Sequence, residues 1–262
     1  MIVDVHTHIF PDELAPRAMY RLQEAAHGVI AYLDGTKADL LRSTEEAGID
    51  RSVVCPVTTK PTQDHAANEW VTSLDDERLI PFGTVHAANE DAPGEVRRAI
   101  ESGVRGFKLH PEYQEFSPTD ARARPMLEAI AEAGVPVLFH AGIDIEIPTV
   151  HGTPEAFAKL NDSLPELDMI LAHMGSFRMW DEVSRWLVGR RVYFDTSYVH
   201  HDLSSIEFAA LVHELGVEKI LFGSDSPWGR QEDEIASVRA AGLSEDETAA
   251  ILGGNAARIL GL

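Results

Sequence analysis

Short apolar runs recur along this chain of 262 residues, and each is followed by a stretch with apolar positions at helical spacing. Eight runs rich in β-branched residues predict strands, at 2–6, 52–55, 79–85, 104–109, 136–140, 169–172, 192–195 and 219–222. Seven intervening stretches predict helices, at 37–47, 64–74, 94–102, 119–133, 153–164, 179–187 and 204–215. Several of these helices are followed by glycine, as helix C-termini commonly are.

This alternation favours one α/β domain over residues 1–262. Strands that alternate with helices form parallel sheets, and eight such units match a (β/α)₈ TIM barrel. A doubly wound open sheet is the alternative, but it usually carries a glycine-rich phosphate loop after an early strand. Here residues 6–11 read His-Thr-His-Ile-Phe-Pro instead. Residues 12–36 and 141–152 are predicted long connections at strand carboxyl ends, where barrels bind substrates.

Polar side chains stand at the carboxyl ends of several predicted strands, although parallel strands are normally near-continuous apolar runs. His6 and His8 share one face of the first strand, because alternate residues point the same way. The later strands end in or lead to Lys108, His110, His140, His173 and Asp225. Closing a barrel would gather these ends around one axis and predicts a metal site. Imidazole and carboxylate ligands suit Zn²⁺ best, with Mn²⁺, Fe²⁺ and Ni²⁺ as alternatives.

Composition argues against macromolecular partners with negative charge and leaves a small-molecule substrate as the expected partner. The formal net charge of −21 argues against binding to nucleic acid or to an anionic membrane surface. Cys55 is the only cysteine, which excludes an intrachain disulfide and a thiolate metal cluster, and we expect it to be buried. The first residues lack a basic signal-peptide region, and no apolar run approaches the roughly 20 residues that cross a bilayer. We therefore expect a cytoplasmic protein.

Five motifs, in this order, resemble the amidohydrolase superfamily, in its branch of TIM-barrel metal-dependent hydrolases and decarboxylases (amidohydrolase 2 type). They are Asp4-Val-His-Thr-His8, Phe139-His-Ala-Gly142, Ala172-His-Met-Gly175, Gly223-Ser-Asp-Ser-Pro227 and Gly254-Asn-Ala-Ala-Arg-Ile-Leu-Gly-Leu262. The resemblance covers the whole chain. It is specific for the family and says little about the substrate.

The resemblance implies a role for each matching residue. His6 and His8 would bind the more buried metal ion, and His140 would add a ligand from the fifth strand. His173 would bind a second ion, or orient substrate if there is one ion. Asp225 would be both a ligand and the proton shuttle, since a metal lowers the pKa of bound water and a nearby carboxylate can take its proton. The implied catalytic residues are thus Asp225 and His173.

Lys108 has two interpretations. In two-metal members of the family, a carboxylated lysine or a glutamate at the end of the fourth strand bridges the ions, so a carboxylated Lys108 would imply a metal pair. An unmodified ammonium has only donors and cannot ligate a cation. Lys108 would then pair with a substrate carboxylate or extend into solvent, and a single ion would suffice.

Four residues near the strand ends are candidate substrate contacts: His110, Tyr113, Arg178 and Trp228. His110 shares the face of Lys108, but a hydrogen bond to a metal ligand would explain it equally well. Arg178 could hold a substrate carboxylate in a bidentate pair, or could be a solvated surface charge.

Two further features are weaker candidates for the chemistry. Asp195 ends the seventh strand, and a helix or turn cap would explain it without a role in the site. His200 and His201 are adjacent and should point apart, so they are not counted as a metal chelate.

Metal-dependent hydrolysis of a small ester, lactone or amide is the leading function. The alternative is non-oxidative decarboxylation of an aromatic or unsaturated carboxylic acid, which uses one metal. A metal-binding barrel without catalysis is the third interpretation. Lys108 and the short chain favour hydrolysis. Family members are often oligomeric, so a homo-oligomer is also left open.

Overall fold

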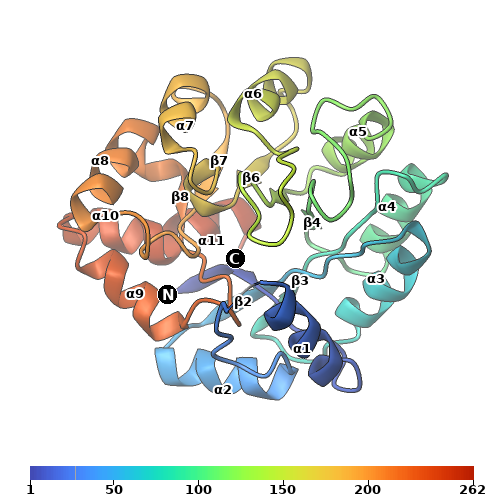
Figure 1. Cartoon of the computed structure of the whole chain (residues 1–262), viewed down its shortest axis with the longest axis horizontal. Helices are drawn as coiled ribbons and strands as arrows, with labels where there is room; N and C mark the ends of the chain where they lie inside the picture. The colour runs from blue at the N-terminus through green and yellow to red at the C-terminus, as the bar shows by residue number, and fades with distance from the viewer. Residues whose placement is uncertain (27) are drawn as a thin grey trace. The chain divides into compact units, whose positions relative to one another are not determined.

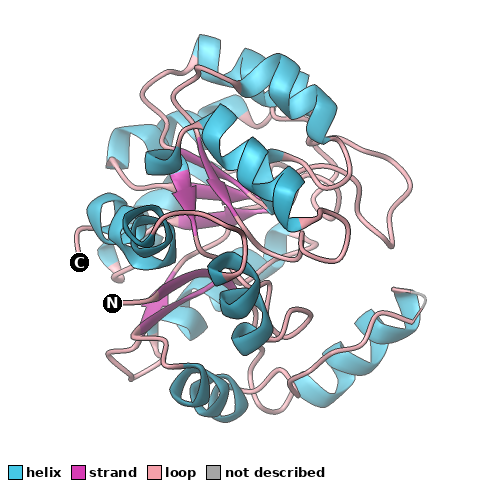
Figure 2. Cartoon of the chain, turned by 90° about the vertical axis from the view of Figure 1, so that its left-hand side faces the viewer, coloured by secondary structure: helices cyan, strands magenta, loops and turns pink. Residues whose placement is uncertain are grey.

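Short strands alternate with helices along the chain (Figures 1 and 2). The computed structural model describes residues 1–26 and 28–262. The chain folds into two compact units, each with its own strands and helices. Unit 1 consists of Met1–Val54, Glu77–Ile80 and Asp195–Leu262, and unit 2 of Cys55–Asp76 and Pro81–Phe194.

Unit 1 is built on the parallel pairing of β1 (Val3–Thr7) with β2 (Arg51–Val54). Every residue of β1 is buried, as expected of a strand in a parallel sheet. β3 (Leu79–Pro81) follows in the order β1-β2-β3. The backbone N–H of Val5 donates to the carbonyl of Phe222 at 2.9 Å, just after β8 (Ile220–Leu221). The segment that follows β8 therefore lies beside β1.

The helices of unit 1 are α1 (Ala15–Ala25), α2 (Lys37–Ala47), α8 (Ser205–Leu215), α9 (Gln231–Arg239), α10 (Glu245–Ala249) and α11 (Asn255–Leu260). A short π-helical segment, Ala250–Gly254, joins the last two. α2 begins where the Thr36 hydroxyl accepts from the Asp39 N–H, and it ends at Gly48 in the left-handed conformation. α2 packs against α9, at the lower left of Figure 1.

Unit 2 is built on parallel strands whose ends lie level with one another. They are β4 (Phe107–Leu109), β5 (Val137–Phe139), β6 (Met169–Leu171) and the first two residues of β7 (Tyr193–Asp195). Leu109 pairs with Phe139, and Phe139 with Leu171. The residues that follow these strands, His110 and His140 among them, therefore emerge at one edge of the sheet.

The helices of unit 2 are α3 (Asp64–Thr72), α4 (Ala92–Glu101), α5 (Arg124–Ala133), α6 (Pro154–Ser163) and α7 (Trp180–Leu187). They pack in neighbouring pairs, α3 with α4, α4 with α5, and α6 with α7 (Figure 1). Fully buried Phe107, Phe139 and Phe157 contribute to the apolar core between these helices and the strands. The rings of Phe139 and Phe157 are 5.2 Å apart.

All eight predicted strands form, but several are shorter than predicted. The strand predicted at 104–109 is ordered as β4 only from Phe107. The residue just before β4 is Gly106. A Cβ at this position would lie only 2.4 Å from the Phe82 ring, so a larger residue would not fit. The helix predicted at 119–133 begins only at Arg124, with a proline in its first turn, and the preceding residues form turns.

Several helices were not predicted. α1 lies within the connection predicted at 12–36, of which residue 27 is outside the described residues. It buries only Ala15 and Met19, so few apolar positions mark it in the sequence. α9, α10 and α11 also went unpredicted. No helix in the described ranges is long and apolar enough to span a bilayer. Cys55 is buried as predicted, and the cytoplasmic location stays a prediction.

Candidate metal centre

Three predicted ligands converge in unit 1. His6 Nε2 and His8 Nε2 are 3.1 Å apart, and each lies 3.3 Å from Asp225 Oδ1. Metal–ligand bonds of about 2.0 Å in a tetrahedral site place ligand atoms about 3.3 Å apart, so one ion fits this triangle. Two backbone hydrogen bonds hold together the two segments that bear these ligands. The Asp225 N–H donates to the His6 carbonyl, and the His8 N–H donates to the Ser226 carbonyl.

Asp195 orients the first of these ligands. His6 Nδ1 lies 2.9 Å from Asp195 Oδ2, and both side chains are buried. A carboxylate can only accept at this contact, so His6 carries its proton on Nδ1 and turns the Nε2 lone pair toward Asp225. Asp195 also accepts from the Ser197 N–H at 3.0 Å, which is the turn-capping role predicted for it. The prediction was therefore incomplete, because the partner of Asp195 is distant in sequence.

Asp4 links the two strand ends that carry these ligands. It is fully buried in β1, and its carboxylate accepts from Ser224 N–H, Ser224 Oγ, Gln231 Nε2 and His6 N–H at 2.6–3.2 Å. Burial raises the pKa of Asp4 to about 6, and the hydrogen bonds oppose that shift. Asp4 thus ties β1 to the turn before Asp225 and to the start of α9.

His140 and His173 form a second close pair, in unit 2. His140 Nδ1 and His173 Nε2 are 3.2 Å apart, a separation that also suits two ligands of one ion. His173 adopts a φ of 59° at the start of a tight turn, and Trp180 Nε1 donates to its carbonyl at 3.1 Å. A side chain other than glycine in this left-handed region is uncommon, and such strained residues concentrate at functional sites.

His110 is placed differently from its neighbour His140. The two rings stack with centroids 4.1 Å apart and planes within 5° of parallel. Lone pairs of parallel rings lie in separate planes and cannot converge well on one ion. His110 instead stands between two acids, with Nε2 3.6 Å from Asp144 Oδ2 and Nδ1 3.7 Å from Glu112 Oε2. His110, His140 and Asp144 each offer a ligand atom within 4.8 Å of the others. Because the two rings are parallel, a substrate contact or a hydrogen-bonding role nevertheless fits His110 better than a ligand shared with His140.

Glu112 is a buried acid that sequence reasoning missed. Its Oε1 accepts from the His151 and Gly152 N–H groups, both at 2.9 Å, and so fixes the end of the connection at 141–152. Burial is the main cause that raises the pKa of Glu112 to about 7, and the nearby charge of Asp144 adds to it. The only sign in the sequence that Glu112 lies near the candidate site is its position two residues after His110.

The remaining predicted residues occupy varied surroundings. Lys108 is buried in β4, and its carboxylation stays a prediction. Tyr113 donates its hydroxyl to Glu146 at 2.6 Å. Arg178 is exposed, with its guanidinium 4.8 Å from the Phe177 ring centroid. Trp228 is half-buried and donates its backbone N–H to the Asp225 carbonyl.

The six predicted metal ligands thus fall into two sets. His6, His8 and Asp225 belong to unit 1, and Lys108, His140 and His173 belong to unit 2. The prediction that they share one centre stays a prediction.

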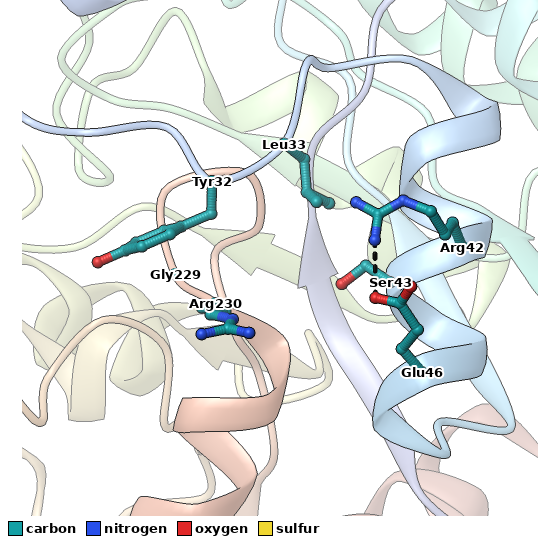
Figure 3. Close-up of a pocket in the computed structure, with 7 residues that line it drawn as sticks. All are labelled: Tyr32, Leu33, Arg42, Ser43, Glu46, Gly229 and Arg230. Carbon is teal, nitrogen blue, oxygen red and sulfur yellow. Dashed lines mark hydrogen bonds and ion pairs between the residues drawn. The ribbon is translucent and has the colours of Figure 1, made fainter.

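A cavity of about 290 Å³ in unit 1 is lined by other residues (Figure 3): Tyr32, Leu33, Arg42, Ser43, Glu46, Gly229 and Arg230. Arg42 is paired with Asp39 and Glu46, and Arg230 with Glu232. The cavity therefore offers an anionic substrate little net positive charge, and none of the predicted metal ligands lines it.

A family model described as amidohydrolase matches residues 3–262. The chain belongs to the amidohydrolase family. Nearly the whole chain is matched, which agrees with motifs that run from Asp4 to Leu262. No curated protein sequence matches this amidohydrolase.

Solved structures show the fold. An uncharacterised TIM-barrel protein from Bordetella bronchiseptica has a TM-score of 0.79 and 18% identity, with 99% of this chain and 98% of that chain covered. 5-Carboxyvanillate decarboxylase from Sphingomonas paucimobilis has a TM-score of 0.76 and 18% identity, with 100% and 99% covered. A mutant 5-carboxyvanillate decarboxylase from Novosphingobium aromaticivorans, with bound manganese and 3-methoxy-4-hydroxy-5-nitrobenzoic acid, has a TM-score of 0.75 and 14% identity, with 100% and 97% covered. The predicted TIM-barrel fold class is confirmed for this amidohydrolase.

Membership of the family makes a divalent metal ion the expected cofactor, and the residues of this amidohydrolase fit one. The His6–His8–Asp225 triangle has nitrogen and oxygen donors at ligand spacing, and Asp195 sets the required tautomer of His6.

Replacing Asp195 by asparagine is expected to weaken metal binding to this amidohydrolase by about 10- to 100-fold. The amide can still approach His6 Nδ1, but it loses the charge that favours the Nδ1–H tautomer. Competition with a chromophoric chelator measures the change. Asp202→Asn, an exposed acid in the same connection, is the matched control. An affinity for Asp195→Asn equal to that of the control would contradict the orienting role.

The raised pKa of Glu112 predicts that the free energy of unfolding depends on pH. Its folded pKa of about 7 lies above the ordinary 4.5, so between these values the native state binds more protons than the unfolded state. The stabilisation from protonated Glu112 is complete below pH 4.5 and is lost as pH rises through 7, by at most about 3 kcal/mol. We expect Glu112→Gln to remove this part of the pH dependence. Chemical denaturation of metal-free protein at several pH values tests it.

Glu115→Gln, at an exposed position three residues later, provides the control for Glu112→Gln. If the two variants show the same change in free energy of unfolding with pH as the wild type, the assignment to Glu112 fails.

Proposed function

We propose that this amidohydrolase is a metal-dependent carboxy-lyase that removes CO₂ from an aromatic or unsaturated carboxylic acid without an oxidant. The observation that carries the proposal is the single-ion triangle of His6, His8 and Asp225, which needs no bridging lysine. One-metal chemistry is what the family resemblance implies for its decarboxylases. Similarity to two 5-carboxyvanillate decarboxylases, one with bound manganese, supports the same class and makes Mn²⁺ a candidate beside Zn²⁺.

A divalent ion held by these residues would neutralise negative charge on the substrate and polarise its oxygen atoms. The chain itself must supply a proton to the carbon that loses CO₂, because the electron pair of the broken C–C bond stays on that carbon. Asp225 is the best placed donor: 15% of its side chain is exposed, whereas His6 is 1% exposed. His8 is 16% exposed, but a neutral imidazole that binds an ion through Nε2 has no readily released proton, whereas a carboxyl group has a second oxygen that can carry one. The Oδ2 atom of Asp225 would therefore hold and deliver the proton, while His6 serves only as a ligand.

Hydrolysis of an ester, lactone or amide is the second candidate, and Lys108 is the observation that favours it. Lys108 is almost completely buried in β4. A carboxylated Lys108 would carry a negative charge and could bridge two ions, as the resemblance implies for two-metal hydrolases. The length of the chain does not distinguish a hydrolase from a decarboxylase, because the alignment with the Sphingomonas paucimobilis decarboxylase covers 99% of that chain.

The decisive experiment compares product and metal content. Protein loaded with Mn²⁺ or Zn²⁺ is incubated with carboxyl-labelled aromatic acids, 5-carboxyvanillate among them, and separately with a panel of lactones, esters and amides. We expect labelled CO₂ from an acid and no acid release from the panel. Acid release without CO₂ would overturn the carboxy-lyase proposal.

Lys108→Met separates the two candidates further. If the variant keeps every metal ion of the wild type, Lys108 is not a bridge, and the one-metal proposal gains support. Loss of one ion together with hydrolytic activity would establish the second candidate. Inductively coupled plasma mass spectrometry provides the count.

A further inference from the structure

Three buried polar atoms of unit 1 have no hydrogen-bond partner within the described residues: His200 Nε2, Glu234 Oε2 and Gln231 Oε1. Burial removes water from such atoms, and without a new partner nothing recovers the lost solvation. In native proteins, unsatisfied buried polar groups commonly mark a bound water or ion. Three of them in one unit therefore require an explanation.

His200 and Glu234 face each other. His200 Nε2 lies 3.8 Å from Glu234 Oε2, and their side chains are 10% and 4% exposed. His200 follows β7, and its ring packs on Phe208 with centroids 4.8 Å apart. Gln231 precedes Glu234 by one turn on the buried face of α9, and its Nε2 is already engaged with Asp4. Only its oxygen remains for another partner.

The charges around this pair favour a cation. Asp4, Asp195 and Glu234 are buried in unit 1, and in the part of that unit described no lysine or arginine is buried. Burial is the main cause that raises the pKa of Glu234 to about 9, and Asp225 and Asp4 add to it, so without a cation Glu234 holds a proton at neutral pH. A cation that binds here would displace this proton into solvent. Burial also lowers the pKa of His200 to about 4, which keeps the ring neutral with a lone pair to offer.

We propose that His200 Nε2 and Glu234 Oε2 hold a second cation, separate from the His6–His8–Asp225 triangle, and that this cation is a divalent ion such as Zn²⁺ or Mn²⁺. Gln231 Oε1, one helical turn before Glu234, is the candidate for a further oxygen donor. Two ligands of one ion with bonds of about 2.0–2.2 Å lie at most about 4.4 Å apart, so the 3.8 Å separation is compatible. Imidazole nitrogen with carboxylate and amide oxygen is a donor set that such ions accept. The ion would neutralise the buried acids of unit 1. This site does not depend on the proposed carboxy-lyase function.

Metal counting tests the site. Wild type, His200→Leu, Glu234→Met and His201→Leu are dialysed against Zn²⁺ or Mn²⁺, and the bound ions per chain are measured. We expect one ion fewer in His200→Leu and in Glu234→Met. His201→Leu, the exposed neighbour, should keep the wild-type count. Equal counts in all four proteins would overturn the site.

His8→Ala separates this inference from the proposed metal centre. It should lose the ion of the triangle and keep the ion at His200 and Glu234. If instead His8→Ala keeps all its metal while His200→Leu loses one ion, the triangle fails and the second site stands.

Anomalous diffraction from wild-type crystals grown with Mn²⁺ gives a direct answer that does not depend on a variant folding. A manganese peak between His200 Nε2 and Glu234 Oε2 is the expected result. An ordered water there without anomalous signal, or a direct hydrogen bond from a protonated Glu234 to His200, would overturn the proposal.

Discussion

Asp225→Asn is expected to lower kcat/KM by roughly 10²- to 10⁴-fold, the range typical of losing a positioned proton-transfer group. The substitution removes both the charge that faces His6 and His8 at 3.3 Å and the acid that would protonate product carbon. Asp225 has a φ of 58°, and asparagine tolerates this left-handed conformation well. The variant should therefore keep its backbone, and the lost rate should report the carboxyl group alone.

Steady-state kinetics with the best substrate of the labelled acids measures this loss. Asp233→Asn, an exposed acid on α9, is the matched control and should keep wild-type turnover. Metal content measured on the same samples shows how much of the effect is loss of a ligand. If Asp225→Asn keeps turnover within a factor of two of the control, Asp225 is not the proton donor.

Asp4→Ala is expected to lower the free energy of unfolding by about 3–5 kcal/mol, among the largest effects of a single substitution. The change leaves four donors without an acceptor: the N–H and Oγ of Ser224, Gln231 Nε2 and the His6 N–H. It also removes the hydrogen bonds that hold β1 beside the turn before Asp225. Because this contact positions Asp225 near His6 and His8, the affinity for the metal ion should fall as well. Denaturation by urea and chelator competition, both at pH 8 where the carboxylate is ionised, measure the two effects.

Asp50→Ala is the control for Asp4→Ala. Asp50 also accepts a backbone hydrogen bond in unit 1, from the Ile2 N–H at 2.7 Å, but in an exposed position. Water can replace that contact, so we expect a loss below about 1 kcal/mol. A similarly small loss for Asp4→Ala, with metal affinity unchanged, would show that Asp4 does not lock the two strand ends together.

The strands were predictable because buried parallel strands are short, continuous apolar runs. In this chain, polar residues or glycine follow these runs and mark where the strands end. Helices with few apolar positions were harder to predict. α1 buries only Ala15 and Met19, and the first residue of α9, Gln231, is followed by three consecutive acids at 232–234. Their helical state depends on packing, such as that of α2 against α9, which local spacing does not report.

The pairing of His6 with His8 was also predictable, because it follows from the period of a strand. By contrast, Asp195 lies 189 residues from His6, and Asp4 lies 220 residues from Ser224. The sequence alone therefore made Asp195 only a weaker strand-end candidate or a cap, and Asp4 appeared only as the first residue of a motif. Glu112 and Glu234 carried no motif at all.

By itself, the sequence determined the alternating α/β pattern, the family and the identity of the candidate metal ligands, because these depend on local periodicity and on short motifs. Tertiary structure alone decided which carboxylate sets the tautomer of His6, which buried acid ties β1 to the turn before Asp225, and which polar atoms are left without partners beside Glu234. These properties depend on the distance between side chains far apart in the chain and on the removal of water around them. Burial and charge proximity, which shift the pKa of Asp4, Glu112 and Glu234, exist only once the chain has folded.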